Sequence, residues 1–547
     1  MIQKENSLIY NFTLKDVNGW RKWIDVTLCA FPILSIGIYK GGEPSIITHI
    51  MGLYLVFLVF WGFARRDKIV ILKNIFFIPI VIFTVSSFIV TIFSPSFISS
   101  LAGFLEYFSL FLFFLSLLLL KPDKRKLLLV LFFFSFIELI ICLTEVKTGR
   151  VNGTYNYASY IVIPLFFGLL YSYSINNKVI KYTLMSLFLV ASLLTGSRIV
   201  FLFIIALPFF LIKRKIYWSI IPILIILILL IPNPAGRRIK GQVDIYSLQR
   251  PNLWKQAVHT ALERPITGWG SRNYEKVSLK YNFPVEGKYE RSAKITHNQF
   301  LQYFADGGVI LLFAYILIFY VYILNLKKMK LLERSFLGLI LIHSLFDNVL
   351  YLPANFLLFL SILYISSREK VEYNVKLSRN VRKLVPLLAI LYLLPLSSNY
   401  LIKHGEAAFN RKEFSKAYNY LNIAESIWPT PRNETALATV QEQFFINTKE
   451  LGHLFFAFYF YNRAIESDPL DWKIPFKTYE FLIRNRRNAG VENPAIYLEK
   501  AITLNPKERM LYEMLIKEYQ LSGKLNESNR VYFEMQKTFG NLESSNP

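Results

Sequence analysis

Long apolar segments recur along the first 400 residues of this chain and leave it few ways to fold. They run for about 17–25 residues, the helix length that crosses a ~30 Å hydrocarbon core. Because unpaired backbone groups are costly in lipid, such segments cross a bilayer as helices. The expected fold class is therefore all-α, a polytopic helical membrane protein of about 12–13 spans. We read these spans at 24–39, 46–63, 74–93, 98–120, 127–146, 157–174, 182–196, 199–212, 216–232, 308–325, 335–352, 354–366 and 384–399.

The formal net charge of +25 would also suit a nucleic-acid-binding protein, so the placement of the cations has to decide. If 1–22 is a cytoplasmic N-terminus, every even-numbered connection between spans carries lysine or arginine. The odd-numbered connections are short and poor in charge, except for 233–307. Cations gather in the cytoplasmic loops of membrane proteins, so most of the charge reports topology. No nucleic-acid partner is expected.

The connection 233–307 is the exception in both length and charge. By the same count it lies outside the membrane, where topology does not require cations. From 233 to 306 it nevertheless holds twelve Lys and Arg residues against six Asp and Glu residues. A large charged loop on a mostly apolar chain is a place for chemistry, and the cation excess indicates an anionic ligand. We therefore take 23–400 as a transmembrane domain with 233–307 as its outer catalytic loop.

After Tyr400 the chain becomes soluble and helical in character. Two sets of residues there follow the spacing of tetratricopeptide repeats: Gly405, Phe414, Ala417, Leu421, Ala424 and Pro429, then Gly452, Ala457, Tyr461, Ala464 and Pro469. Since Pro429, Pro469 and Pro506 are 40 and 37 residues apart rather than 34, another array of helical hairpins is the alternative. We expect 401–547 to be an extracytoplasmic helical repeat domain, carried outward by the span 384–399, that binds a protein partner.

Four basic residues are candidates for chemistry. Of the six histidines, only His297 stands in a polar outer segment directly before a span, and a neutral imidazole can take a proton from a hydroxyl near pH 7. Arg150, Arg198 and Arg250 occupy outer positions where topology does not require a cation. Guanidinium groups bind phosphate oxygens through paired hydrogen bonds, so the set suits a group transfer with a phosphate leaving group. The alternative is that the arginines reach lipid headgroups.

The loop also predicts a local structure and excludes several kinds of enzyme. Arg250 is expected to open an amphipathic helix with an apolar stripe of Trp254, Val258, Ala261 and Leu262. The chain has no Gly-x4-Gly-Lys-Ser/Thr nucleotide loop, and the outer loop has no Asp-x-Asp pair for a metal on a sugar nucleotide. The two cysteines both lie in spans. No metal and no cofactor are therefore expected.

Two carboxylates, Glu106 and Glu138, lie within predicted spans. Intramembrane carboxylates are functional candidates by default. Glu106 also suits a pair with an arginine near the outer face.

Six short motifs follow one another between about residues 150 and 350: Arg150-x-x-Gly153-Thr154, Thr195-Gly-Ser-Arg198, Arg250-x3-Trp254, Pro265-x-x-Gly268-x-Gly270, His297-Asn298 before Gly307-Gly308, and His343-Ser-Leu-Phe-Asp347 in a late span. In order and topology they resemble the O-antigen ligase and O-antigen polymerase superfamily. The resemblance implies a glycosyltransferase of the bacterial inner membrane. Its donor would be an undecaprenyl-diphosphate-linked glycan, and it would need neither metal nor nucleotide.

The resemblance also implies a role for each candidate residue. His297 would deprotonate the acceptor hydroxyl, while Arg198 and Arg250 would hold the diphosphate and stabilise it as it leaves. Attack opposite the leaving group would invert the anomeric centre. Asn298 would orient His297 or the sugar, and the remaining substrate-binding residues would be Arg150, Trp254 and Asp347.

The acceptor stays open, because the thirteenth span and the repeat domain are additions to the family pattern. A ligase acting on a lipid core is favoured, with a polymerase of glycan repeat units and a protein O-oligosaccharyltransferase as alternatives. A lipid-linked glycan transporter is an alternative of another class, but it should show charges near the midplane and repeated halves. A third alternative is a scaffold that displays the repeat domain, in which His297 would be dispensable.

Overall fold

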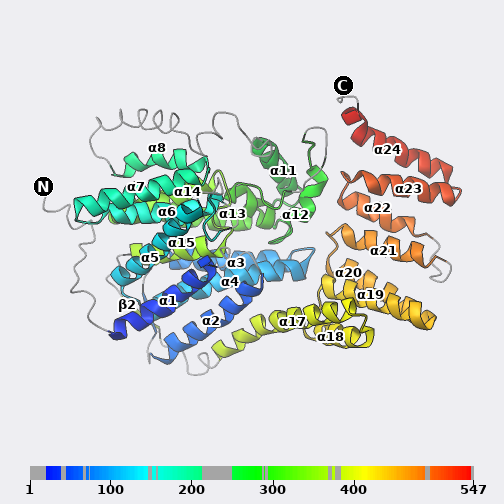
Figure 1. The fold of residues 1–547 in the computed structure, drawn as a ribbon, viewed down its shortest axis with the longest axis horizontal. Helices are drawn as coiled ribbons and strands as arrows, with labels where there is room; N and C mark the ends of the chain where they lie inside the picture. The colour runs from blue at the N-terminus through cyan, green and yellow to red at the C-terminus, as the bar shows by residue number, and fades with distance from the viewer. Residues whose placement is uncertain are drawn as a thin grey trace.

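The computed structural model describes residues 20–38, 45–65, 69–72, 74–145, 151–155, 158–211, 249–285, 289, 293–367, 372–375, 384–486 and 493–543. The molecule is elongated. A bundle of apolar helices occupies one end, and an arc of C-terminal helices occupies the other (Figure 1). The buried residues of the bundle form one continuous hydrophobic cluster, whereas the C-terminal helices have clusters of their own.

Helical segments stand at twelve of the thirteen predicted spans, and the remaining one, 216–232, lies outside the described residues. In the described part of the chain, five helices are long and apolar enough to cross a membrane. The chain is thus an all-α, multi-pass membrane protein. The bundle consists of α1 (Trp20–Ile38), α2 (Ser45–Ala64), α3 (Phe77–Ile92), α4 (Phe97–Leu120), α5 (Lys124–Thr144), α6 (Ala158–Tyr173), α7 (Lys178–Leu194), α8 (Ile199–Leu211), α13 (Gln299–Asn325), the short η9 (Leu326–Lys328), α14 (Leu331–Ser344) and α15 (Pro353–Ser366).

Two predicted boundaries were wrong, and both matter for the site. In the expected span 335–352, helix α14 ends at Ser344. The next helix opens with Pro353 at its first position, where proline is favoured. Asp347 therefore lies in a loop between helices and not in a span. The expected span 308–325 begins nine residues earlier, since α13 starts at Gln299 and continues past a kink at Gly308.

The kink at Gly308 is a docking point for the loop segment 265–270. With φ 59° and ψ −157°, Gly308 has a backbone conformation that is essentially restricted to glycine. The kink frees backbone groups of α13, and the loop takes them up. Trp269 N donates to Ala305 O at 3.1 Å, and Gly270 N donates to Asp306 O at 2.7 Å. The segment 268–270 has positive φ at both of its glycines.

A short two-stranded ribbon, which the sequence did not predict, joins two distant connections. Strand β1 (Ile69–Leu72) pairs antiparallel with β2 (Glu372–Val375), with Ile69 opposite Val375. The first strand follows the second span, and the other precedes the last span. Both connections therefore lie at the same end of the bundle, which is the relation that their shared positive charge predicts.

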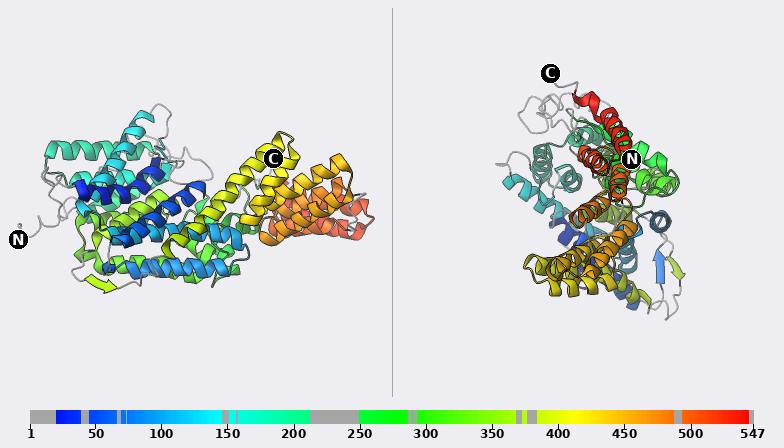
Figure 2. Two further views of the ribbon diagram at one scale, coloured as in Figure 1. Left: turned by 90° about the horizontal axis from the view of Figure 1, so that it is seen from below. Right: turned by 90° about the vertical axis from the view of Figure 1, so that its right-hand side faces the viewer.

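The last predicted span forms the short η10 (Val385–Ala389) and then α17 (Ile390–Asn410), one helix that packs on α2 and continues out of the bundle. Figure 2 shows this helix leading from the bundle to the C-terminal arc. The arc is a chain of antiparallel helical hairpins: α17 with α18 (Phe414–Ile427), α19 (Pro431–Thr448) with α20 (Leu451–Ser467), α21 (Lys473–Arg484) with α22 (Ala495–Leu504), and α23 (Arg509–Leu521) with α24 (Leu525–Glu543).

Alanines at the predicted spacing allow the hairpin helices to pack closely. Ala424, Ala464 and Ala501 are each fully buried in the second helix of a hairpin. Gly405 is also a packing residue, because a Cβ there would lie 2.7 Å from Leu421. Its supposed counterpart Gly452 is not, since a Cβ there would meet open space. The second copy of the motif therefore matches in its second helix but not at Gly452.

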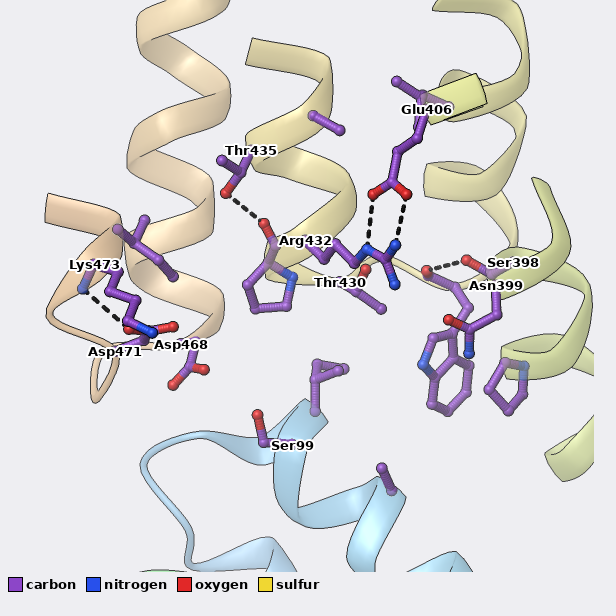
Figure 3. Close-up of a pocket in the computed structure, with 18 of the residues that line it drawn as sticks. Ser99, Ser398, Asn399, Glu406, Thr430, Arg432, Thr435, Asp468, Asp471 and Lys473 are labelled. Carbon is purple, nitrogen blue, oxygen red and sulfur yellow. Dashed lines mark hydrogen bonds and ion pairs between the residues drawn. The ribbon is translucent and has the colours of Figure 1, made fainter. Parts of the chain in front are cut away.

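The C-terminal arc rests against the described part of the outer loop. Lys276 forms an ion pair with Asp468, and Trp269, Val277 and Leu470 form a small buried apolar cluster. The loop and the C-terminal helices thus lie at the same end of the bundle, which is the relation that an odd number of spans predicts. A cleft of about 870 Å³ lies between them and the bundle, and Figure 3 shows Ser99 of the bundle facing the paired Glu406 and Arg432 of the arc.

Candidate active site

The helix that Arg250 was expected to open is α11 (Arg250–Glu263), and it is followed by the short α12 (Tyr274–Val277) and η8 (Ser278–Tyr281). Pro251 directly follows Arg250, a position at which proline suits a helix. The predicted apolar stripe was partly wrong. Ala261 is buried as expected, but Val258 and Leu262 are exposed, and the buried face is completed by Gln256, Ala257 and Thr260.

His297 is held by its neighbours in a left-handed backbone conformation, with φ of 51°. Such a conformation costs free energy for a residue other than glycine, and residues held in strained conformations cluster at functional sites. Trp254 of α11 donates from its indole nitrogen to the carbonyl oxygen of His297 at 3.2 Å. Asn298 caps α13 by accepting from Phe300 N and Leu301 N, and donates from its side chain to Leu345 O at 2.9 Å. Trp254 and Asn298 therefore fix the backbone that presents the imidazole.

Asp347 joins His297 to Arg250. Because a carboxylate can only accept, Nδ1 of His297 donates to Oδ1 of Asp347, at 3.0 Å. The other oxygen of Asp347 lies 3.5 Å from a terminal nitrogen of Arg250. The Asp347 side chain is almost fully buried, while those of His297 and Arg250 are about one third exposed. The carboxylate is thus the buried centre of the cluster, and the two basic groups face outward from it.

The electrostatics keep Asp347 charged. Burial by itself would raise the pKa of Asp347, but the hydrogen bond and charge of His297, together with the charge of Arg250, hold this pKa well below its usual range. With Nδ1 of His297 committed to the carboxylate, Nε2 is the nitrogen that can accept a proton. A carboxylate in this position also stabilises the imidazolium that forms. The arrangement can therefore act as a general base beside a guanidinium group.

A second layer of amides supports the cluster, and the sequence analysis did not identify it. Asn348 N donates to Oδ1 of Asp347 at 2.9 Å, and the Asn348 side chain donates to Oε1 of Gln302 at 2.9 Å. Gln302 also accepts from Thr296 N at 3.1 Å and donates to Asp306 at 3.1 Å. Gln299, Gln302 and Asp306 stand at helical spacing, which is a signal that they share one face of α13.

Arg198 lies in the turn between α7 and α8, directly before Ile199. Helix α8 packs on α14, and the ring of Phe203 meets the ring of His343 edge-on at 5.6 Å. His343 is fully buried, four residues before Asp347. Neither ring nitrogen of His343 has a hydrogen-bond partner among the described residues. Packing therefore brings α8, the helix that begins directly after Arg198, against the helix that leads to Asp347.

Arg150 lies outside the described residues, but the turn that follows it is held by two carboxylates. Asn152 N and Gly153 N donate to Glu145, each at 2.9 Å, and Thr154 N donates to Glu138 at 3.1 Å. Glu138 is thus an anchor for the turn 152–154. Glu106, the other carboxylate that was predicted to lie in a span, pairs with Arg272. Such a pair with an arginine was the alternative to a functional role for Glu106.

Comparison with known proteins is consistent with this site. Residues 183–316 match the family model described as O-Antigen ligase. No curated protein matches the chain. The matched region includes Arg198, α11 and His297. It supports the O-antigen ligase superfamily and, at that level, a membrane enzyme that transfers glycans as a ligase or polymerase.

Proposed function

We propose that the protein transfers a glycan from an undecaprenyl-diphosphate carrier to an acceptor hydroxyl at the outer face of the bacterial inner membrane. The observation that carries the proposal is the cluster in which His297 and Arg250 share the buried carboxylate of Asp347. This cluster pairs a proton acceptor with a group that binds phosphate. The family match over 183–316 supplies the class of reaction.

In the proposed step, Nε2 of His297 takes the proton of the acceptor hydroxyl as its oxygen attacks the anomeric carbon. The bond from that carbon to the diphosphate oxygen breaks, and the carrier leaves as undecaprenyl diphosphate. Attack from the opposite side inverts the anomeric centre. Arg250 and Arg198 stabilise the charge that develops on the diphosphate, so the step as proposed needs no metal. Asp347 holds the imidazole in the right tautomer and stabilises its cation.

The residues around the cluster keep narrower roles in this proposal. Asn298 and Trp254 position His297 through the backbone contacts described above. For Asp347, expected as a substrate-binding residue, we now propose the role of partner to the base. Arg150 remains a proposed substrate-binding residue.

We also propose that the outer loop and residues 401–547 are extracytoplasmic, and that the C-terminal hairpins are tetratricopeptide-like repeats. Support comes from the charge placement, the contact between Lys276 and Asp468, and the alanine spacing of the hairpins. Such arrays bind proteins or peptides, so a protein partner or a protein acceptor fits this part. A ligase acting on a lipid core remains favoured over a polymerase and a protein O-oligosaccharyltransferase.

The test is His297→Ala, with His259→Ala as its matched control. His259 is an exposed histidine of the same loop that stacks on Tyr281. Loss of a general base typically slows transfer by ~10²–10⁴-fold, so His297→Ala should abolish glycan transfer in cells while the protein is still inserted at its normal level. His259→Ala should transfer as the wild type does. Normal glycan transfer by the His297→Ala variant would contradict the proposed mechanism and favour the scaffold or the transporter alternative.

A further inference from the structure

A cavity of about 230 Å³ adjoins the residues that support the candidate active site. Its lining includes Gln299, Gln302 and Leu350. Gln299 accepts a hydrogen bond from Leu350 N at 3.1 Å, and Gln302 belongs to the amide layer beneath Asp347. A molecule in this cavity would therefore contact the groups that position the catalytic carboxylate.

Two polar atoms on the cavity wall lack the hydrogen bonds that buried groups normally make. Ser271 is 1% exposed and Asp306 is 3% exposed. Within the part of the chain that the structure describes, neither Oγ of Ser271 nor Oδ1 of Asp306 has a hydrogen-bond partner. Because buried polar groups are nearly always paired, these two atoms point to an occupant that offers hydroxyl groups.

The charge of the lining decides what kind of occupant fits. Three carboxylates, Glu106, Glu275 and Asp306, line the cavity, against the two cations Arg272 and Lys294. Arg272 is already paired with Glu106. Among the described residues, Lys294 is then the one lining cation outside an ion pair, which is too few for a diphosphate, whereas neutral sugar hydroxyls can donate to carboxylates and accept from serine. The tyrosines of the wall, Tyr107, Tyr274 and Tyr351, add the aromatic rings and hydroxyls that suit an amphipathic ligand.

The cavity is also connected to the cluster by hydrogen bonds. Gln302 donates to Oδ2 of Asp306 and accepts from the side chain of Asn348, which in turn donates from its backbone to Asp347. The unpaired oxygen of Asp306 is thus three hydrogen bonds away from the partner of His297. An occupant of the cavity is therefore linked through this network to the carboxylate that positions His297.

We propose that this cavity, lined by Ser271, Gln302 and Asp306, is a saccharide subsite that binds a hydroxyl-rich sugar residue next to the reacting bond. The proposal rests on the glycan transfer proposed above and names the part of the substrate that this cavity takes. The sugar belongs either to the donor glycan or to the acceptor, and both offer the same hydroxyl chemistry. The diphosphate is bound elsewhere, at the arginines of the cluster.

The main test is Ser271→Ala in the full-length protein in nanodiscs. It removes one oxygen that has no partner among the described residues, so the fold should be unaffected. Ser335→Ala is the matched control, because Ser335 is also fully buried and its hydroxyl is also unpartnered among the described residues, but it lies in α14 and does not line the cavity. Asp306→Asn serves as a second variant, since it keeps the shape of the side chain and removes the charge.

Two oligosaccharide probes distinguish the sources of the sugar. One is the glycan released by mild acid from the carrier lipid of a strain that lacks this protein. The other is the acceptor oligosaccharide released from the cell surface of the same strain. Binding is followed by saturation-transfer NMR, with sugar-free undecaprenyl diphosphate as the anionic control.

Loss of one hydrogen bond should weaken binding of one of the two oligosaccharides to Ser271→Ala by about 3–10-fold, and Asp306→Asn should weaken it at least as much. Ser335→Ala should bind that oligosaccharide normally, and undecaprenyl diphosphate should bind all variants alike. The proposal is wrong if neither oligosaccharide binds the wild type, or if both bind Ser271→Ala as tightly as the wild type. That result would leave the proposed function intact as long as His297→Ala still abolishes transfer.

Discussion

Asp347 accepts a hydrogen bond from Nδ1 of His297 at 3.0 Å, across 50 residues of sequence. The contact links the segment that opens α13 to the loop that follows α14. It also explains why His297 has an unfavourable backbone conformation, since the conformation brings the imidazole to the carboxylate. Trp254, Asn298 and Asn348 then hold the two partners in place.

Replacing Asp347 with asparagine should reduce glycan transfer by roughly 10²–10⁴-fold, because the amide cannot hold the imidazole in the same tautomer or stabilise its cation. Transfer is measured as the rate of glycan appearance on the acceptor in membranes with equal protein. Glu263→Gln is the control, since Glu263 is a carboxylate of the connection 233–307 that pairs with Lys280. Normal transfer by Asp347→Asn would remove the carboxylate from the mechanism.

The Asp347→Asn substitution should also change how the thermal stability of the protein depends on pH. The folded-state pKa of Asp347 is depressed, so the carboxylate stabilises the fold above its unfolded pKa of ~3.9 and loses this contribution as pH falls below it. The thermal midpoint of Asp347→Asn should therefore lie below that of the wild type at pH 7, and the gap should be narrower at pH 3, where part of the contribution is already lost. A gap that is the same at both pH values would contradict the depressed pKa.

Arg250→Lys should slow transfer by roughly 10–10²-fold, less than the 10²–10³-fold expected of Arg250→Ala. Lysine keeps the charge near Asp347 but lacks the planar fork that meets two phosphate oxygens at once. Lys255→Ala, which removes an exposed cation from the same helix, should have no effect. An active Arg250→Lys protein would mean that only a positive charge is needed at this position.

Gly268→Ala should disrupt docking of the loop on α13. Gly268 has φ of 62°, and a Cβ there would lie 2.4 Å from Gly307 N. Since backbone cannot yield as a side chain does, we expect lower thermal stability and loss of transfer together. Gly452→Ala is the contrasting control. Its Cβ would meet open space in α20, where alanine should be neutral or add about 0.5–1 kcal/mol.

In the C-terminal arc, Glu434→Gln should stabilise the protein at alkaline pH. Burial raises the pKa of Glu434 to about 7, even though Arg463 lies 3.3 Å away. Between the unfolded pKa of ~4.3 and pH 7 the folded protein binds the extra proton, so wild-type stability falls as pH rises through that window. The thermal midpoint of the neutral variant should exceed that of the wild type by roughly 2–5 °C at pH 8 and match it near pH 4.

The control for this pH effect is Glu513→Gln, because Glu513 is an exposed carboxylate paired with Arg509 on the surface of the arc. Its stability should follow the wild type throughout. An advantage of Glu434→Gln that does not change between pH 4 and pH 8 would show that titration of this carboxyl is not its cause.

The spans could be predicted because their length is set by the bilayer, but their ends could not. The residues between α14 and α15 include Phe346, Val349 and Leu350, and an apolar loop that is buried has the composition of a helix. Pro353 was the local signal that the span had ended. Likewise Gly307-Gly308 marked the kink in α13, while the nine helical residues before it were too polar to be read as part of a span.

The reactive groups of the site could be proposed from residue type and position, whereas their connections could not. His297 and Arg250 stood out as a base and a cation on the outer side. That Asp347 joins them depends on the packing of α11, α13 and α14, which no local pattern specifies. The role of Gln302 could have been suspected from the sequence, because a polar face of Gln299, Gln302 and Asp306 at the start of a membrane helix is unusual. The two strands could not be predicted from the sequence, since they pair across a long stretch of the chain.

One helix, α17, belongs both to the bundle and to the first hairpin of the arc. The orientation of the arc about the axis of α17 is therefore fixed by the part of α17 that packs in the bundle. One residue inserted after Pro395 would swing the whole arc by about 100° and carry Asp468 away from Lys276. Seven inserted residues would return the arc to within about 20° of its original orientation, but further from the bundle along the axis of α17.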